Sequence, residues 1–389
     1  MAKTKFIYGF RKKLLDLGIL IRLYNKSFRV FGFISAFKEI SKYYQDNRCL
    51  FNTNPNRYLK KAHEIIAVPD MPPVNSKEFI EYIIQDIKWI NHGNLPQPVF
   101  AIVCITSKCP FKCKYCYNSN LHTNEERLSK ETIIENIRKL INNNIESIYL
   151  SGGEPMMREN DLHEIITEFK ETKTRFWLLS TGYNLDIDKL LNLKKIGLKG
   201  VMISLDSIES GQINIVKGSP KAFAYAENAI RAANNAGLIV AIDSVFGKKL
   251  LERVNFTNFI NFLGEKGAHF INCYSPKQMH HVLDGEYDSF TLTDFEKLNK
   301  LINNNHRSKQ FKNLPITYSP DIWESKRGCV GGKIFIYIDP AGDVKKCPFI
   351  EKSYGNLSKR SLNEIMLNLR QESEENICNT NRLLKDKQF

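Results

Sequence analysis

The 389-residue chain has no hydrophobic run long enough to cross a bilayer. A spanning helix needs about 18 or more apolar residues in succession, so an ordinary transmembrane helix is not expected. The first 26 residues are too charged through their apolar part for a secretory signal peptide, and no small-residue cleavage site follows. These absences predict a cytoplasmic protein, and thiols stay reduced in that compartment. The nine cysteines therefore indicate metal binding or redox work rather than disulfides.

The ligands of a conventional zinc site are also lacking. Cys109, Cys113 and Cys116 form a C-x3-C-x2-C pattern, but no second cysteine knuckle exists and no His follows closely. Structural zinc usually takes four such ligands. Three thiolates on one short loop suit a cubane iron–sulfur cluster, because each can hold one iron and leave the fourth iron open. An iron–sulfur site is therefore favoured, with zinc or a metal-free structural role as the alternatives.

Positive charge surrounds these cysteines. Lys112 and Lys114 lie between the thiols, and Lys108 directly precedes the first of them. Their charge is expected to lower the pKa of the thiols and to offset the charge of a bound cluster. Buried structural cysteines fit poorly among three lysines, so the metal-free interpretation is the weaker one.

The chain lacks a dinucleotide-binding glycine fingerprint, although its middle part alternates apolar strands with amphipathic helices. Six strand–helix units follow one another between residues 98 and about 310. Such alternation predicts a parallel sheet covered by helices. Six units without the fingerprint indicate an α/β fold of the partial (β/α)6 TIM-barrel type, whose chemistry lies at the C-terminal ends of the strands. The cysteine loop directly follows the first predicted strand.

We predict three regions. Residues 1–95 form a basic, mainly helical N-terminal extension, residues 96–310 the partial barrel, and residues 311–389 a small α+β module of short strands. The net charge of +14 is concentrated at the start, since the first 65 residues hold 14 Lys and Arg against four Asp and Glu.

The N-terminal region also has an apolar stripe at helical spacing, and Gly18 and Gly32 are expected to divide it into shorter helices. Two interpretations stay open. The stripe packs on the main domain and leaves a solvated basic face, or residues 1–45 dock on an anionic membrane surface, nucleic acid or an acidic peptide. The stripe consists of Phe6, Phe10, Leu14, Leu17, Ile21, Tyr24, Phe28 and Phe31.

The motifs at successive strand ends resemble the radical S-adenosylmethionine (SAM) superfamily. CPFKCKYC matches its cysteine signature, SGGEP at 151–155 its Gly-Gly-Glu motif, and STG at 180–182 and SLDS at 204–207 follow in family order. The resemblance covers roughly residues 98–310. It implies a [4Fe–4S] cluster on Cys109, Cys113 and Cys116 that binds SAM. Reductive cleavage of SAM would then give a 5′-deoxyadenosyl radical that abstracts hydrogen from a substrate.

The resemblance also gives roles to single residues. Gly152 and Gly153 let the backbone approach the amino-acid end of SAM, where a Cβ would clash. Glu154 accepts hydrogen bonds from the SAM ammonium group. Tyr115 occupies the aromatic position of the signature and lines the adenine side.

Further cofactor contacts are expected from the next strand ends. Ser204 and Asp206 are two residues apart, so they face the same side of a strand and are expected to bind ribose hydroxyls. Ser180 is a weaker candidate for the same contact. Lys217-Gly218 stands where relatives usually have Arg-Gly, so Lys217 is expected to pair with the SAM carboxylate without the bidentate fork of an arginine.

A second set of cysteines lies near the C-terminus. The turn Pro340-Ala341-Gly342-Asp343 predicts a hairpin that brings Cys329 and Cys347 together. This segment resembles the start of a SPASM domain, and the missing later cysteine run resembles the shorter twitch form. The resemblance implies an auxiliary [4Fe–4S] cluster on Cys329, Cys347 and Cys378, with Cys273 as a conceivable fourth ligand or an open position. A degenerate module with buried cysteines is the alternative.

The resemblance leaves the substrate open among a peptide, a small metabolite and a lipid, and it implies an electron donor such as flavodoxin or ferredoxin. No catalytic acid or base is assigned. The competing hypothesis is a non-catalytic cysteine-cluster metal protein that binds nucleic acid or an anionic surface through its basic N-terminal region. Nucleic acid is the less favoured partner, because aromatic residues are sparse among the basic ones.

Overall fold

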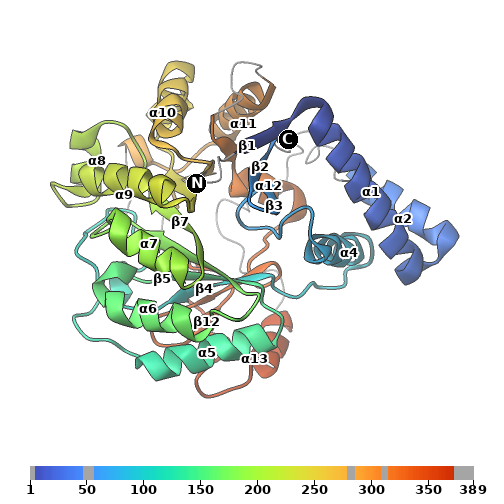
Figure 1. Ribbon diagram of the computed structural model, residues 1–389, viewed down its shortest axis with the longest axis horizontal. Helices are drawn as coiled ribbons and strands as arrows, with labels where there is room; N and C mark the ends of the chain where they lie inside the picture. Colours follow the sequence, from blue (N-terminus) through green and yellow to red (C-terminus); the bar gives the residue numbers. More distant parts are fainter. Residues whose placement is uncertain (1–4, 47–56, 278–284, 308–313, 372–389) are drawn as a thin grey trace.

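A nine-stranded sheet forms the centre of the molecule in a computed structural model that describes residues 5–46, 57–277, 285–307 and 314–371 (Figure 1). The strand order is β10-β9-β8-β7-β6-β5-β4-β11-β12, and every pair from β10 to β11 is parallel. The strands are β4 (Phe100–Cys104), β5 (Ser147–Ser151), β6 (Arg175–Ser180), β7 (Leu198–Ser204), β8 (Ile239–Val245), β9 (Phe270–Tyr274), β10 (Ile316–Tyr318), β11 (Phe335–Ile338) and β12 (Val344–Lys345).

Helices follow each of the strands β4 to β9, so the predicted partial barrel of six β/α units is confirmed. Side-chain caps begin two of them, since Ser129 accepts the amide of Thr132 and Asp186 that of Lys189. The helices are α5 (Lys130–Asn142), α6 (Glu159–Glu168), α7 (Ile187–Lys195), α8 (Ser210–Val216), α9 (Ala222–Ala236), α10 (Arg253–Lys266) and α11 (Leu292–Arg307).

Side-chain alternation along the strands divides the interior into two clusters. In β9, Ile271 and Cys273 pack outward in the large cluster beneath the helices, whereas Phe270 belongs to a second cluster inside the barrel. The inner cluster also holds Tyr149 and Trp177, whose rings stack. Large side chains therefore fill the part of the lumen around Tyr149 and Trp177.

The N-terminal region closes the end of the barrel where the strands begin. A small antiparallel sheet of β1 (Lys5–Tyr8), β2 (Arg57–Lys61) and β3 (Glu64–Ile66) carries Leu59 and Ile66, which pack in the inner cluster. The buried guanidinium of Arg57 donates to the carbonyl of Pro315, just before β10. Among the described residues of this region, the helices are α1 (Gly9–Phe31), α2 (Phe33–Asp46) and α4 (Lys77–His92).

One expectation for these helices is wrong. Gly18 does not interrupt the helix, because α1 runs unbroken for 23 residues. A single glycine costs a helix only about 1 kcal/mol relative to alanine, and tertiary contacts exceed that. Gly32, with φ of 83°, does separate α1 from α2. Within the described ranges, every helix is too short or too polar to cross a lipid bilayer.

The sheet continues beyond residue 310. β10 pairs in parallel with β9, and β11 pairs in parallel with β4. The predicted hairpin is present, because β11 and β12 are antiparallel around a turn in which Asp339 accepts the amides of Ala341 and Asp343. Helices α12 (Pro320–Arg327) and α13 (Leu362–Arg370) lie before and after these strands. The boundary at residue 310 is therefore not a boundary of the sheet.

We predict that Ile336→Ala lowers the free energy of unfolding by about 2–5 kcal/mol, because it leaves a cavity in the fully buried centre of β11. Denaturant titration measures the change, with Leu367→Ala on the exposed side of α13 as the control. A loss below about 0.5 kcal/mol would contradict the packing of β11 in the main core.

Candidate functional site

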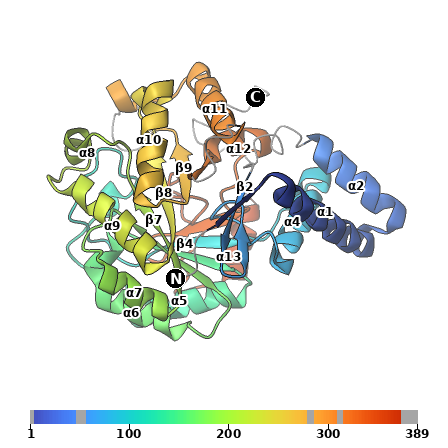
Figure 2. The same cartoon turned by 45° about the horizontal axis from the view of Figure 1, so that its top comes forward.

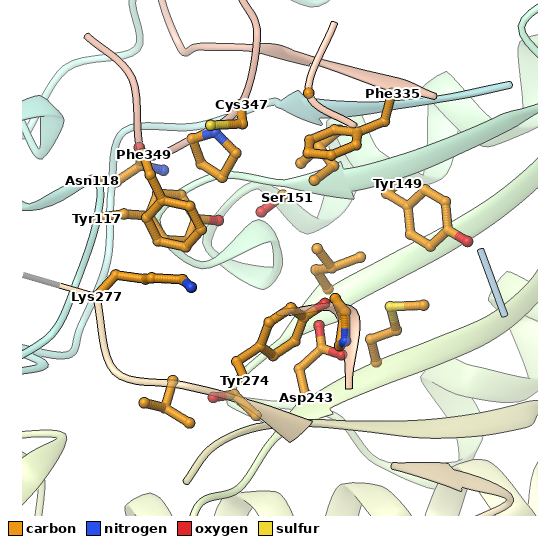
Figure 3. A pocket seen from close by; sticks show the side chains of 18 of the residues that line it. Tyr117, Asn118, Tyr149, Ser151, Asp243, Tyr274, Lys277, Phe335, Cys347 and Phe349 are labelled. Atoms are coloured by element: carbon orange, nitrogen blue, oxygen red, sulfur yellow. The ribbon is translucent and has the colours of Figure 1, made fainter. Parts of the chain in front are cut away.

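A cavity of about 350 Å³ lies inside the barrel, toward the C-terminal ends of its strands. Cys109, Cys113 and Cys116 line one part of it, and Cys329 and Cys347 line another. Figure 3 shows part of its wall, where the Tyr117 ring lies next to that of Phe349. The structure therefore brings the cysteine loop and, from the second predicted set, Cys329 and Cys347 to one cavity.

The cysteine loop is tied to the end of β5 and to the C-terminal end of α8. The amide of Gly153 donates to the carbonyl of Thr106, and the amide of Glu154 donates to that of Lys108. On the other side, the amide of Lys112 donates to the carbonyl of Lys217 at 3.0 Å. The Phe111 ring, at the tip of the loop, is buried in the large outer cluster.

The contact between the cysteine loop and the end of β5 requires the glycine pair Gly152 and Gly153. A Cβ on Gly152 would lie 2.6 Å from the carbonyl oxygen of Thr106, and one on Gly153 would lie 2.2 Å from that of Lys108. Both neighbours are backbone atoms, so neither can turn aside. The glycines thus allow the cysteine loop to lie directly against the end of β5. Their predicted contact with SAM stays a prediction, although both residues line the cavity.

The three cysteines of the loop are half-buried. Burial raises the pKa of Cys109 to about 12 and that of Cys116 to about 11, and it also raises the pKa of Cys113. The buried ammonium of Lys217 acts against burial and favours the thiolates of Cys113 and Cys116. The expected effect of Lys108, Lys112 and Lys114 on the thiols stays a prediction.

The three thiols face a common space, because Cys109, Cys113 and Cys116 all line the cavity and their charges interact. Among the described residues, no three His, Cys, Asp or Glu side chains are grouped around a site for a single metal ion. In a cubane each of three cysteines would hold a different iron, so the predicted cluster ligands stay a prediction that the shared cavity supports.

Glu154 is buried and hydrogen-bonded entirely within the protein. One carboxylate oxygen accepts the Ser180 hydroxyl at 2.8 Å and the amide of Met156, and the other accepts the amide and hydroxyl of Thr181. The cavity is lined by Ser180 and Thr181 rather than by Glu154 itself. The predicted bond from Glu154 to an ammonium group stays a prediction, and in this arrangement Glu154 orients the end of β6.

A buried polar group joins Tyr115, Ser204, Asp206 and Lys217. The ammonium of Lys217 donates to the Ser204 hydroxyl at 2.6 Å and lies 3.5 Å from the Asp206 carboxylate. Tyr115 donates its hydroxyl to Asp206. Burial alone would lower the pKa of Lys217, but the charges of Asp206 and Cys113 outweigh it and raise the pKa. The predicted residues are thus brought together, and their contacts with SAM stay predictions.

The second cysteine set is brought together only in part. Cys347 is buried. A Cβ placed on Gly331, which lies two residues after Cys329, would be 3.3 Å from the Cβ of Cys347, so the segments that carry the two cysteines are neighbours. Cys378 lies outside the described residues. Cys273 does not fit as a further ligand, because it points from β9 into the outer cluster, away from the lumen.

His122 was missed by the sequence analysis, which found no His close after the cysteines. Its Nε2 lies 3.8 Å from Sγ of Cys116, and both residues line the cavity. Burial lowers the pKa of its imidazole, which favours the neutral form. The available signal was a histidine six residues after the last cysteine of the signature.

Acidic residues deep in the lumen were missed as well. Burial raises the pKa of Asp243 to about 7, and the charge of Asp70 adds to the effect while the Asn272 amide opposes it. Burial likewise raises the pKa of Asp70 to about 6. Figure 3 shows Asp243 beside the Tyr274 ring, facing the open part of the cavity. An aspartate at the inward-facing position of β8 was the available signal.

Comparisons with known proteins agree with this site. The profile of the radical SAM superfamily matches residues 103–254. An AdoMet-dependent heme synthase of Nitratidesulfovibrio vulgaris is 24% identical over 288 residues, which cover 67% of this chain and 76% of that protein.

Solved structures show the same fold. Streptococcus suis SuiB bound to S-adenosylmethionine has a TM-score of 0.59 at 15% identity, covering 90% of this chain and 84% of SuiB. The protein anSMEcpe with bound AdoMet has a TM-score of 0.55 at 18% identity, covering 73% and 82%.

Fold and site together define an enzyme that uses a [4Fe–4S] cluster with SAM. Residues 103–254 form a domain of the radical SAM superfamily. The competing hypothesis of a non-catalytic metal protein is therefore wrong.

We predict that Gly153→Ala removes most of the iron bound at the cysteine loop, because the new Cβ cannot fit against the Lys108 carbonyl. Iron and sulfide analysis of anaerobically purified protein measures this, and the loss should approach the four irons of one cubane, about 4 per chain. Gly211→Ala is the matched control, since nothing lies within 4 Å of its Cβ position. Unchanged iron content in the Gly153 variant would contradict the close contact.

Proposed function

We propose that this enzyme oxidises a substrate held in the lumen between two iron–sulfur sites. The observation that carries the proposal is that one cavity is lined by both Cys109, Cys113 and Cys116 and by Cys329 and Cys347. Cys109, Cys113 and Cys116 would hold the cluster that, together with SAM, would supply hydrogen-atom abstraction from the substrate, and Cys329 and Cys347 would hold an auxiliary cluster that would serve as the electron acceptor.

The chain's own residues would keep this chemistry away from water. The N-terminal sheet closes one end of the barrel, and the cysteine loop and the 346–350 segment line the other. Large apolar side chains occupy much of the wall, among them Phe100, Leu179, Met202 and Trp323. An enclosed, mainly apolar lumen protects a carbon radical from solvent.

Asp243 would accept the proton that the substrate loses. Its carboxyl faces the lumen and its pKa is raised to about 7, so it can take up or release a proton near neutral pH. Loss of one hydrogen atom, then of one proton to Asp243 and one electron, balances as a two-electron oxidation. A buried ion pair of Lys277 and Asp321 forms another polar part of the wall.

Among the three substrate classes, we favour a peptide. SuiB has been solved with its precursor peptide SuiA, with a TM-score of 0.60 at 14% identity, and anSMEcpe with the Cp18Cys peptide, with a TM-score of 0.53 at 18% identity. A cavity of about 350 Å³ has room for one large side chain beside the cofactor end. Its walls favour an apolar or aromatic side chain with a hydrogen-bond donor that can reach Asp243.

We predict that wild-type enzyme, reduced with dithionite under anaerobic conditions, converts SAM to 5′-deoxyadenosine and contains about eight irons. The Cys329→Ala/Cys347→Ala variant should keep SAM cleavage and hold about four irons. The triple Ala variant of Cys109, Cys113 and Cys116 should lose cleavage. Chromatography with mass spectrometry detects the nucleoside. Unchanged iron in the double variant would remove the auxiliary cluster from the proposal.

We predict that Asp243 makes the stability of the enzyme fall as pH rises from about 4 to about 7. Its pKa in the folded chain is about 7 against 3.8 for an ordinary Asp, so folding favours the protonated form and that advantage is lost as the pH rises through this window. Relative to Asp243→Asn, wild type should lose up to about 1.4 kcal/mol per pH unit there. Denaturant titrations across the range measure it, and parallel curves for the two proteins would contradict it.

A further inference from the structure

Helix α1 exposes most of the apolar stripe that the sequence predicts, whereas Phe6 and Phe31 at its two ends are half-buried and pack against the protein. Positions 10, 14, 17, 21, 24 and 28 fall within about 80° of one another at 100° per residue. Apart from Tyr24, which is half-buried, the side chains at these positions are exposed. Adjacent apolar side chains at the start of α2 are exposed as well. The exposed fractions lie between 48% and 86% for Phe10, Leu14, Leu17, Ile21, Phe28, Phe33, Ile34 and Phe37, which we term the α1–α2 apolar face.

A different side of α1 makes the contacts within the protein. Leu23 is buried in a cluster with residues of α4, and Leu15 and Ile19 pack against the same cluster. Arg22 donates to the carbonyls of Val74, Asn75 and Ser76. These contacts hold α1 against the rest of the protein, and none of them involves a residue of the α1–α2 apolar face.

The exposed side chains form one continuous surface across the two helices. The Phe33 ring meets Phe28 edge-on at 5.8 Å and Tyr24 at 6.4 Å, so α1 and α2 are joined through their outward aromatic residues. Figures 1 and 2 show both helices at one edge of the molecule, with α4 beside them. The surface is accessible and lies away from the main sheet.

The charges around this surface are positive. Arg11, Lys13, Arg29 and Lys38 are exposed, and within the described part of the chain none of them has an ion-pair partner. Two nearby acidic side chains are engaged with the protein: Asp16 accepts from Lys12 and Tyr58, and Glu39 accepts from Asn91 and lies 3.0 Å from His92.

We propose that the α1–α2 apolar face docks on an anionic lipid bilayer surface, with both helices lying in the plane of the interface. Aromatic and aliphatic side chains would enter the boundary between headgroups and acyl chains, and the flanking cations would meet lipid phosphates. Charge complementarity selects this occupant, because an apolar surface flanked by cations matches an anionic membrane and repels a second copy of itself. The inference is independent of the proposed function of the lumen.

Flotation of the full-length protein with vesicles tests the proposal. Wild type should float with vesicles of phosphatidylcholine and phosphatidylglycerol, and at least tenfold less with phosphatidylcholine alone. High salt should weaken the binding, because screening acts on exposed charges. The neutral variant Arg11→Gln/Lys13→Gln/Arg29→Gln/Lys38→Gln should bind at least about a hundredfold more weakly, since each cation near an anionic surface contributes roughly fivefold.

An apolar variant separates the two contributions. Phe33→Ser/Ile34→Ser/Phe37→Ser should also lose at least about tenfold in vesicle binding. The matched control is Ile215→Ser/Val254→Ser/Leu367→Ser, which removes three equally exposed apolar side chains elsewhere and should bind like wild type. Circular dichroism and the iron content check that every variant is folded.

Three outcomes would overturn the proposal. The first is a folded wild type that floats with neither vesicle. The second is a wild type that light scattering shows to be a dimer, and that the Phe33→Ser/Ile34→Ser/Phe37→Ser variant converts to a monomer, because the face would then be an interface between copies. Equal loss of binding in the control variant would likewise show that the effect is not specific to this face.

Discussion

The contact between the cysteine loop and the end of β5 determines the rest of the site. The amides of Gly153 and Glu154 hold the carbonyls of Thr106 and Lys108, and only glycine leaves room for that approach. Because the loop is fixed through its backbone, its cysteine side chains remain directed at the lumen. Buried Lys217 then supplies the positive charge that favours two of the thiolates.

The enclosure of the lumen depends on segments far apart in the chain. Tyr337 of β11 donates to Asn118, which in turn donates to the carbonyl of Gly152, so β11, the segment after the cysteines and the end of β5 are linked. At the other end, Leu59 and Ile66 of the N-terminal sheet pack in the inner cluster. The lumen is therefore closed where its strands begin, and the cysteine loop and residues 346–350 line it where they end.

Side-chain periodicity was enough to predict the six β/α units, and the resemblance to the radical SAM superfamily identified the motifs at their C-terminal ends. The alternation of side chains along β9 also indicated that Cys273 faces outward. Properties set by long-range packing could not be predicted in this way. The burial of Glu154, the raised pKa of the thiols and the exposed part of the apolar stripe on α1 all depend on which distant segments meet. The role of Cys378 stays a prediction.

The central claim is that three thiols at the mouth of the barrel leave one iron of a cubane open for SAM. Electron paramagnetic resonance of the dithionite-reduced protein tests it most directly. The account predicts the signal of a reduced [4Fe–4S] cluster whose g-values shift when SAM is added, in wild type and in a variant lacking Cys329 and Cys347. A cluster signal that SAM leaves unchanged, or no cluster signal at all, would contradict it.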